Sequence, residues 1–245
     1  MLGIISDTHG NLVALKAILA DANKLGIRQF ICLGDVANFG PNPKETFDLV
    51  KSLNCPIVLG NTDAYLLKPR QKEDIVKITK DTPMHLEIEA WCAEQLTTDD
   101  KQNIDSWPMN YKMNYKNTSV LMFHASPSSY HDIIVASTES NQVEKYLEGY
   151  SADLFLHGHT HAQYIRKYKA SRILNPGSAG LPYFIGEGSS PTNPTFAEYA
   201  TLSVENGQAN ISFRRVAYSL ADLKQSVLDS SMPHQDWWLK NWQQA

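Results

Sequence analysis

The chain has 245 residues, 42% of them apolar, and 22 Lys and Arg against 26 Asp and Glu give it a formal net charge of −4. This composition is typical of a globular protein of one or two domains and excludes a disordered or collagen-like chain. The mild acidity argues against non-specific nucleic-acid binding, and no apolar run approaches the roughly 20 residues of a membrane span.

The first 63 residues are predicted to alternate strands and helices. The expected elements are strands at 1–6, 28–33 and 56–59 and helices at 11–25 and 42–53. Gly26 closes the first helix, and Asn42 is the expected N-cap of the second, with Pro43 in its first turn and Glu45 three residues after the cap. A polar motif follows every strand. Repeated β-α units predict a parallel sheet whose ligands bind at the carboxyl ends of its strands.

Residues 64–107 interrupt this alternation and are rich in charge. Helices are predicted at 83–96 and 98–106, the second capped by Thr97 or Thr98. We expect these helices to form a small cap that buries its apolar residues beside the carboxyl ends of the strands.

The rest of the chain predicts a second sheet. The expected elements are a hairpin of 109–115 and 118–125 turning at Lys116-Asn117, a helix at 139–149, strands at 153–157, 163–168 and 172–174, a Gly/Pro/Ser loop at 177–195, a hairpin of 196–204 and 208–216 turning at Asn206-Gly207, and helices at 219–229 and 236–242. The sum is a single α/β domain over 1–245, a four-layer αββα sandwich of two mixed β-sheets. It carries the helical cap insertion at 64–107 and a C-terminal helical tail at 219–245.

Groups that can bind metal ions stand at the ends of five predicted strands. They are Asp7, His9, Asp35, Asn61, His124, His159 and His161. Oxygen and imidazole ligands together suit borderline divalent ions such as Mn, Fe, Co, Ni or Zn, whereas Mg and Ca sites use oxygen almost alone. Seven ligands are more than one ion needs, so the pattern predicts two ions that share a bridging carboxylate.

Each motif has an ordinary structural explanation when it is taken alone. An Asp-x-His sequence often arises by chance, the Gly-Asp at Asp35 and the Gly-Asn at Asn61 are typical of turns, and His124 alone is typical of a histidine at a strand end. The Gly-His-Thr-His sequence that ends at His161 is less common. The support lies in the occurrence of all of these motifs, each after a predicted strand.

The motifs together resemble those of the calcineurin-like metallophosphoesterase family. The matching segments are Asp7-x-His9, Gly34-Asp35, Gly60-Asn61-x-Asp63, His124, Gly158-His159-x-His161 and Asn175-Pro176-Gly177-Ser178. The match extends from residue 2 to about residue 182. Within the family, the set of motifs is similar to that of the small bacterial branch of phosphodiesterases and diadenosine-tetraphosphatase-like proteins.

The resemblance implies a role for each ligand. Asp7, His9 and His161 would bind a first metal ion, Asn61, His124 and His159 would bind a second, and Asp35 would bridge the two. A hydroxide shared by the ions would attack the phosphorus in line. Mn is the favoured metal. The candidate catalytic residues are Asp35, Asn61, His124, Thr62 and Asp63.

Two departures from the family pattern bear on the substrate. Phosphomonoesterases of the family carry a His at the position of Thr62, and a hydroxyl cannot supply a proton at neutral pH as imidazole can. Asp63, which would orient that His, has a loop-capping role as its alternative. Family protein phosphatases also place Arg beside the Asp35 and Asn61 motifs, and none is present at either place. Both departures favour phosphodiester or phosphoanhydride bonds.

Further residues are candidates for contacts with a substrate. They are Asn11, His131, Tyr183 and Phe184. His131 could replace the missing donor, and the two aromatic residues could stack on a nucleobase, with plain loop packing as the alternative. His157 is expected to be a core histidine. Trp237, Trp238 and Trp242 are expected to dock on the body of the protein or to form a dimer contact.

We therefore expect a cytoplasmic, metal-dependent phosphodiesterase that acts on a small phosphorylated substrate such as a nucleotide, with no membrane partner. The sequence is also compatible with a homodimer. The absence of room for a signal peptide before the first strand, and three cysteines without metal-site spacing, support the location. The alternatives are an asymmetric dinucleoside polyphosphate hydrolase and a non-catalytic scaffold with the same fold.

Overall fold

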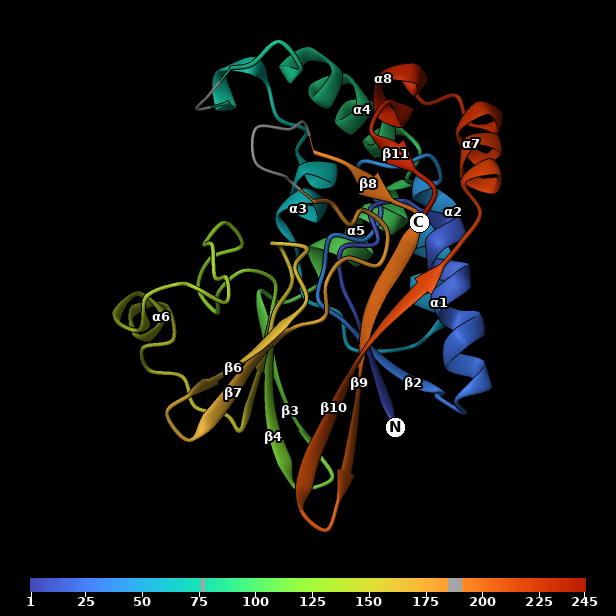
Figure 1. The fold of residues 1–245 in the computed structure, drawn as a ribbon. Coiled ribbons are helices and arrows are strands. Elements are labelled where there is room, and N and C mark those ends of the chain that lie inside the picture. The colour runs from blue at the N-terminus through green and yellow to red at the C-terminus, as the bar shows by residue number, and fades with distance from the viewer. Residues whose placement is uncertain (76–77, 185–190) are drawn as a thin grey trace.

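The computed structural model describes residues 1–75, 78–184 and 191–245. Two mixed β-sheets pack face to face, and helices lie on their outer sides (Figure 1). This arrangement confirms the predicted αββα sandwich. Within the described ranges, no helix has both the length and the apolar character that a membrane crossing requires. The expectations for 185–190, in the middle of the predicted loop, lie outside the described residues.

The first sheet has the strand order β10-β9-β1-β2. Its strands are β1 (Leu2–Ile5), β2 (Gln29–Cys32), β9 (Phe196–Glu205) and β10 (Gln208–Ala217). β1 and β2 are parallel, and the other pairs are antiparallel. The strand predicted at 56–59 is reduced to one parallel bridge between Cys32 and Ile57. It ends there because the N–H of Leu59 leaves the sheet and donates to the carbonyl of Pro108.

The second sheet has the order β3-β4-β5-β7-β6. Its strands are β3 (Asn110–Tyr115), β4 (Thr118–Phe123), β5 (Leu154–Leu156), β6 (Tyr164–Tyr168) and β7 (Ser171–Asn175). The predicted hairpin of β3 and β4 is confirmed, and Lys116 and Asn117 both have positive φ angles, which the two-residue turn requires. β4, β5 and β7 are parallel, so their carboxyl ends point the same way.

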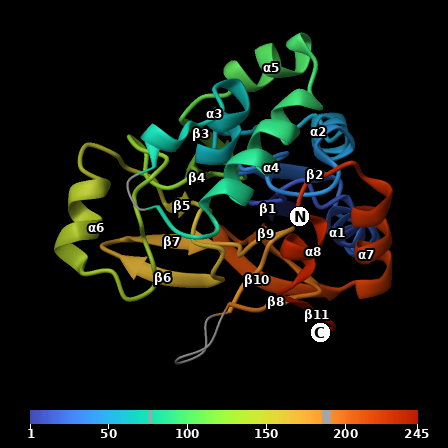
Figure 2. The same cartoon turned by 90° about the horizontal axis from the view of Figure 1, so that it is seen from above.

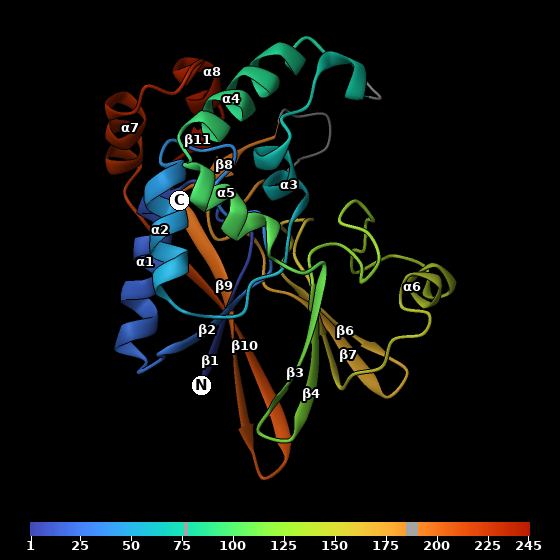
Figure 3. The same cartoon turned by 180° about the vertical axis from the view of Figure 1, so that it is seen from behind.

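Helices cover the outer faces of the two sheets (Figures 2 and 3). The helices are α1 (Leu12–Lys24), α2 (Pro43–Ser52), α3 (Asn61–Leu67), the 3₁₀ turn η1 (Lys72–Asp74), α4 (Thr82–Glu94), α5 (Thr98–Asp105), α6 (Ser140–Tyr146), α7 (Leu220–Asp229) and α8 (Gln235–Leu239). Asn11 caps α1 and Thr97 caps α5 through their side chains. Asn42 precedes α2 without a capping bond, because its side-chain oxygen accepts from Ser226 instead. The sequence did not indicate α3, which begins directly at Asn61.

The C-terminal tail ends in a strand rather than in a helix. α8 stops at Leu239, and Trp242 belongs to β11 (Trp242–Gln243), which pairs in parallel with β8 (Asn193–Pro194). The prediction of a helix as far as Trp242 is therefore wrong at its end. Figure 1 shows α8, β11 and β8 beyond the same end of the sandwich as α3 and α4.

Three apolar clusters hold these layers together. The central cluster lies between the sheets and includes Ile4, Ile31, Val120 and Leu156, each fully buried. A second cluster packs α1, α2, α4, α5 and α7 over the first sheet, and a third packs α6 over the second sheet. Burial of one such side chain contributes about 1.5–3 kcal/mol. The strand ends that follow this core are accordingly well fixed in space.

Candidate metal centre

The loops that follow five β-segments converge at one end of the sandwich. Asp7 and His9 follow β1, Asp35 follows β2, His124 directly follows β4, and His159 and His161 follow β5, while Asn61 is the first residue of α3. Asp7, His9, Asp35 and His124 are at most 4% exposed. The structure thus brings all seven predicted ligand residues together.

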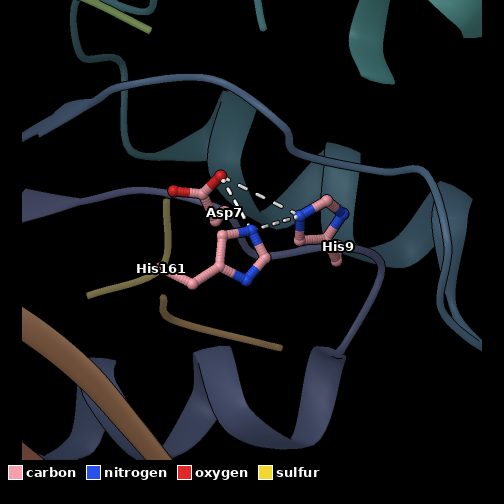
Figure 4. Close-up of side chains that lie close together, drawn as sticks. All are labelled: Asp7, His9 and His161. Carbon is pink, nitrogen blue, oxygen red and sulfur yellow. Dashed lines mark hydrogen bonds and ion pairs between the residues drawn. The ribbon is translucent and has the colours of Figure 1, made fainter. Parts of the chain in front are cut away.

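Asp7, His9 and His161 form one compact group (Figure 4). The Nε2 atoms of His9 and His161 are 3.2 Å apart, and Oδ1 of Asp7 lies 3.3 Å from Nε2 of His161 and 3.9 Å from Nε2 of His9. Their ring and carboxylate atoms point toward one shared volume.

A second group lies beside the first. Oδ1 of Asn61 is 3.0 Å from Nε2 of His124 and 2.9 Å from Nδ1 of His159. Oδ2 of Asp35 is 3.3 Å from Nε2 of His124 and 3.7 Å from Nε2 of His9. Asp35 therefore lies between a residue of each group.

Backbone carbonyls fix the orientation of three of these imidazole rings. The contacts join Nδ1 of His9 to the carbonyl of Asn38 at 3.1 Å, Nδ1 of His124 to that of Leu33 at 2.8 Å, and Nδ1 of His161 to that of Leu181 at 2.6 Å. An Nδ1–H that donates to a carbonyl leaves the Nε2 lone pair of a neutral ring facing the group. Lone pairs, carboxylates and an amide oxygen then converge, an arrangement that a cation stabilises. The donor set therefore fits divalent metal ions of the borderline class.

The electrostatics of the centre also favour a positive charge. Burial alone would lower the pKa of His124, but the carboxylates of Asp35 and Asp7 outweigh it and raise that pKa to about 10. Burial would likewise raise the pKa of Asp35, yet His124 and His9 hold it well below its ordinary value. The carboxylates thus stay ionised and attract a cation or a proton.

The backbone at these residues is strained. Positive φ angles occur at Asp7 (55°), His9 (44°), Asp35 (56°), His159 (67°) and His161 (55°). This region is uncommon for residues other than glycine, and such strain gathers at functional sites. Two glycines allow the close approach: a Cβ on Gly60 would collide with the carboxylate of Asp35, and one on Gly158 with Ser6.

Asp63 holds the loop of Asp35 and does not face the two groups. Its carboxylate accepts hydrogen bonds from the backbone N–H of Asp35 at 2.7 Å, Val36 at 2.8 Å and Gly60 at 3.0 Å. Burial, together with the charge of Asp35, raises the pKa of Asp63 to about 7. These contacts agree with the loop-capping alternative for Asp63, and its catalytic assignment stays a prediction.

Thr62 also acts through its backbone. Its N–H donates to Oδ1 of Asp35 at 2.9 Å, and its carbonyl accepts from the side chain of Asn38. Its hydroxyl oxygen is buried and has no hydrogen-bond partner among the described residues. The structure thus shows Thr62 holding the loop of Asp35 through its backbone, and its assignment as a catalytic residue stays a prediction.

The other candidates are spread around the centre. Asn11 is fully buried and bonds to Ala14, Gly180 and Tyr218, so it holds two segments together instead of contacting a substrate. The ring of Tyr183 lies 5.4 Å from that of His161.

His131 and Phe184 are the remaining substrate candidates, and His157 is the expected core histidine. His131 is exposed and stacks on Tyr65, with ring centroids 6.2 Å apart. Phe184 packs on Phe196, with ring centroids 5.9 Å apart. His157 is a buried core histidine that bonds to Tyr164, as expected.

The sequence did not reveal the backbone carbonyls that orient the imidazole rings of the centre, which belong to Leu33, Asn38 and Leu181. Every residue carries a carbonyl, so no side-chain pattern marks the three that orient imidazole rings. Only the fold places them.

Comparison with known proteins gives a consistent result. The sequence pattern of the family described as "Calcineurin-like phosphoesterase superfamily domain" matches residues 1–207. The "Uncharacterized protein MJ0912" of Methanocaldococcus jannaschii is 28% identical over 95% of this chain and 94% of its own length. The crystal structure of a metallophosphoesterase from Sphaerobacter thermophilus is similar with a TM-score of 0.69 at 25% identity, covering 98% of this chain and 96% of that one. The hypothetical protein PH1004 from Pyrococcus horikoshii OT3 shares the fold, with a TM-score of 0.79 at 17% identity, covering 98% of this chain and 97% of that one.

Proposed function

This chain belongs to the calcineurin-like phosphoesterase superfamily, and on that basis we propose that it is a dinuclear metal-dependent phosphodiesterase. The position of Asp35 between His9 and His124 is the observation that carries the proposal. One carboxylate in that position can serve two cations at once, as a bridging ligand must.

The proposed ligand sets follow the two groups of side chains. Asp7, His9 and His161 would hold one ion, Asn61, His124 and His159 the other, and Asp35 both. Bound divalent ions neutralise charge on phosphoryl oxygens and supply a nucleophilic water at neutral pH. Mn²⁺ is the metal that we propose among the divalent ions that a mixed oxygen and imidazole set accommodates.

The chain's own residues keep this arrangement rigid. The carbonyls of Asn38, Leu33 and Leu181 hold the rings of His9, His124 and His161 in the orientation that offers Nε2. Asp63 and the N–H of Thr62 hold the loop and the carboxylate of Asp35. Ligands fixed in advance need little reorganisation when charge develops on a substrate.

The proposed preference for phosphodiesters rests on the absence of a general acid at the position of Thr62. A monoester is a dianion whose alkoxide leaving group requires a proton, and a positioned acid contributes about 10²–10⁴-fold. The hydroxyl of Thr62 cannot act as that acid, because it does not give up a proton at neutral pH as an imidazolium does. Diesters of acidic phenols, and phosphoanhydrides such as dinucleoside polyphosphates, have leaving groups that depart without protonation. The same observation therefore supports the hydrolase of dinucleoside polyphosphates as a second candidate.

The test compares a monoester whose leaving group needs a proton with substrates whose leaving groups do not. The purified protein is stripped of metal with a chelator, reloaded with Mn²⁺, and assayed with bis(p-nitrophenyl) phosphate, glycerol 2-phosphate as the monoester with an alkoxide leaving group, and a dinucleoside polyphosphate. We expect kcat/KM for the diester to exceed that for the monoester by at least about 10-fold, and Thr62→His to shift the ratio toward the monoester. A wild-type preference for the monoester would contradict the proposal. Metal binding without turnover of any substrate would favour the non-catalytic scaffold.

A further inference from the structure

An aromatic cleft of ≈ 430 Å³ lies between the C-terminal tail and the loops of the candidate metal centre. We call it the aromatic cleft and define it by its ring-bearing residues, which are Phe39, His85, Tyr183, Trp237, Trp238 and Trp242. Its volume falls within the roughly 300–1,000 Å³ of pockets that bind small molecules. Three of the six rings come from a segment beyond residue 207, where the match to the family pattern ends.

The aromatic cleft adjoins the candidate metal centre. The ring of Tyr183 lies 5.4 Å from the ring of His161. Leu181, which also lines the cleft, provides the carbonyl that accepts from Nδ1 of His161. On the opposite side, Phe39 follows Asn38, whose carbonyl fixes His9. The cleft therefore lies directly beside the side chains that would hold a phosphoryl group.

The chemistry of the walls selects a flat, uncharged group. None of the described residues that line the cleft is Asp, Glu, Lys or Arg. Burial lowers the pKa of His85, so its imidazole is neutral at pH 7. The indole N–H groups of Trp237 and Trp238 already donate, to Asp81 and to the carbonyl of Phe39, so the walls offer mainly ring surfaces.

The backbone at Phe39 is held in an unusual conformation. Its φ of 79° lies in the left-handed region, where a bulky residue is an outlier. The hydrogen bond of 2.7 Å from Trp238 to its carbonyl fixes this conformation, and the ring of Phe39 then meets that of His85 at 5.2 Å. Strain of this kind persists where the surrounding structure enforces it.

We infer that the aromatic cleft binds the nucleobase of a nucleotide-type phosphodiester whose phosphoryl group lies at the candidate metal centre. The inference rests on the proposed phosphodiesterase function and names its substrate class. Stacking of a base on aromatic side chains increases affinity about 10- to 100-fold. An uncharged end of the substrate then lies among rings, and the anionic group lies among the metal ligands.

The test uses three diesters that share the p-nitrophenolate leaving group. They are thymidine 5′-(p-nitrophenyl phosphate), methyl p-nitrophenyl phosphate and hexyl p-nitrophenyl phosphate. In the Mn²⁺-loaded protein, kcat/KM for the thymidine ester should exceed that for the methyl ester by about 10- to 100-fold, mainly through KM. A hexyl ester that gains as much as the thymidine ester would show selection for apolar bulk and would overturn the inference.

Variants of the cleft should remove this preference. Tyr183→Ala and Trp237→Ala should each lower the ratio of thymidine to methyl ester at least about 5-fold, and Trp237→Phe should restore part of it. Tyr111→Ala is the matched control, because Tyr111 is 42% exposed, much as Tyr183 is 40% exposed, and lies on β3 outside the cleft. Thermal melts verify that each variant is folded.

A binding measurement separates the two proposals. Adenosine 5′-monophosphate is titrated into the metal-free protein while tryptophan fluorescence is recorded. We expect saturable quenching that Tyr183→Ala weakens and Tyr111→Ala leaves unchanged. Turnover of all three diesters at equal kcat/KM without quenching would overturn the inference and leave the phosphodiesterase intact. Quenching without turnover of any diester would overturn the phosphodiesterase alone.

Discussion

The carboxylate of Asp63 accepts a 2.7 Å hydrogen bond from the backbone N–H of Asp35. The same carboxylate also binds the N–H of Val36 and of Gly60, so one buried side chain joins the loop after β2 to the start of α3. The two loops carry Asp35 and Asn61, which belong to different parts of the candidate metal centre.

Replacing Asp63 should disturb both loops. Asp63→Asn places an amide NH₂ where the carboxylate accepted an N–H, so at least one buried donor loses its partner. We expect a loss of about 2–3 kcal/mol in the free energy of unfolding and a 10- to 100-fold weaker affinity for metal. Urea titration and calorimetric metal titration measure the two effects. Unchanged values in both would show that these hydrogen bonds contribute little.

Asp35→Ala should lower metal content in both proposed sites. One carboxylate lies between His9 and His124, so its removal takes negative charge from each group. We expect fewer than one tightly held ion per chain and a loss of more than about 100-fold in kcat/KM. Asp48→Ala, which removes an exposed carboxylate on α2, is the control. Two retained ions with full turnover would disprove the bridging role.

Thr62→Val should be tolerated. The hydroxyl of Thr62 is buried and lacks a hydrogen-bond partner among the described residues, so an isosteric methyl group removes a desolvated polar atom. We expect the free energy of unfolding to stay the same or to rise by up to about 1 kcal/mol, with diesterase activity within about 2-fold of wild type. A large loss of activity would mean that the hydroxyl reaches the substrate after all.

Asp21→Asn should reveal an acid-sensitive contact between α1 and the first sheet. Asp21 accepts hydrogen bonds from Arg214 at 2.7 and 2.9 Å and from Tyr199 at 2.6 Å, and these bonds lower its pKa in the folded protein. The stabilisation is complete above the unfolded pKa of about 3.9 and is lost as the pH falls through the lower folded pKa.

At pH 7 we expect the variant to be less stable by about 1–2 kcal/mol, since water screens the partly exposed Arg214. The difference should shrink in melts recorded between pH 4 and pH 2. A constant difference over that range would rule out the charge of Asp21 as its source.

The sequence predicted the elements whose signals are local. The hairpin turns at Lys116-Asn117 and Asn206-Gly207 were found because Asn and Gly readily adopt the positive φ angles that a two-residue turn requires. The seven ligand residues were found because parallel strands bring their carboxyl ends to one edge.

What the sequence missed depends on contacts between distant segments. Asn42 has the side chain of a helix cap, but Ser226 of the tail takes its oxygen. Trp242 continues a helical pattern, yet pairing with β8 draws it into a strand. Loop capping was one of the two roles expected for Asp63, but no local pattern identifies the three backbone donors that its carboxylate meets.

The origin of the ligands in both sheets has a consequence for biosynthesis. Asp7 leaves the ribosome well before its partner His161, which lies 154 residues (161 − 7) further along the chain. A nascent chain that ends before β5 has the first carboxylates without the imidazoles that complete the centre. Metal should therefore bind late, after both sheets have formed. Because it binds only the folded state, it should raise the melting temperature of the protein in proportion to the logarithm of the metal concentration.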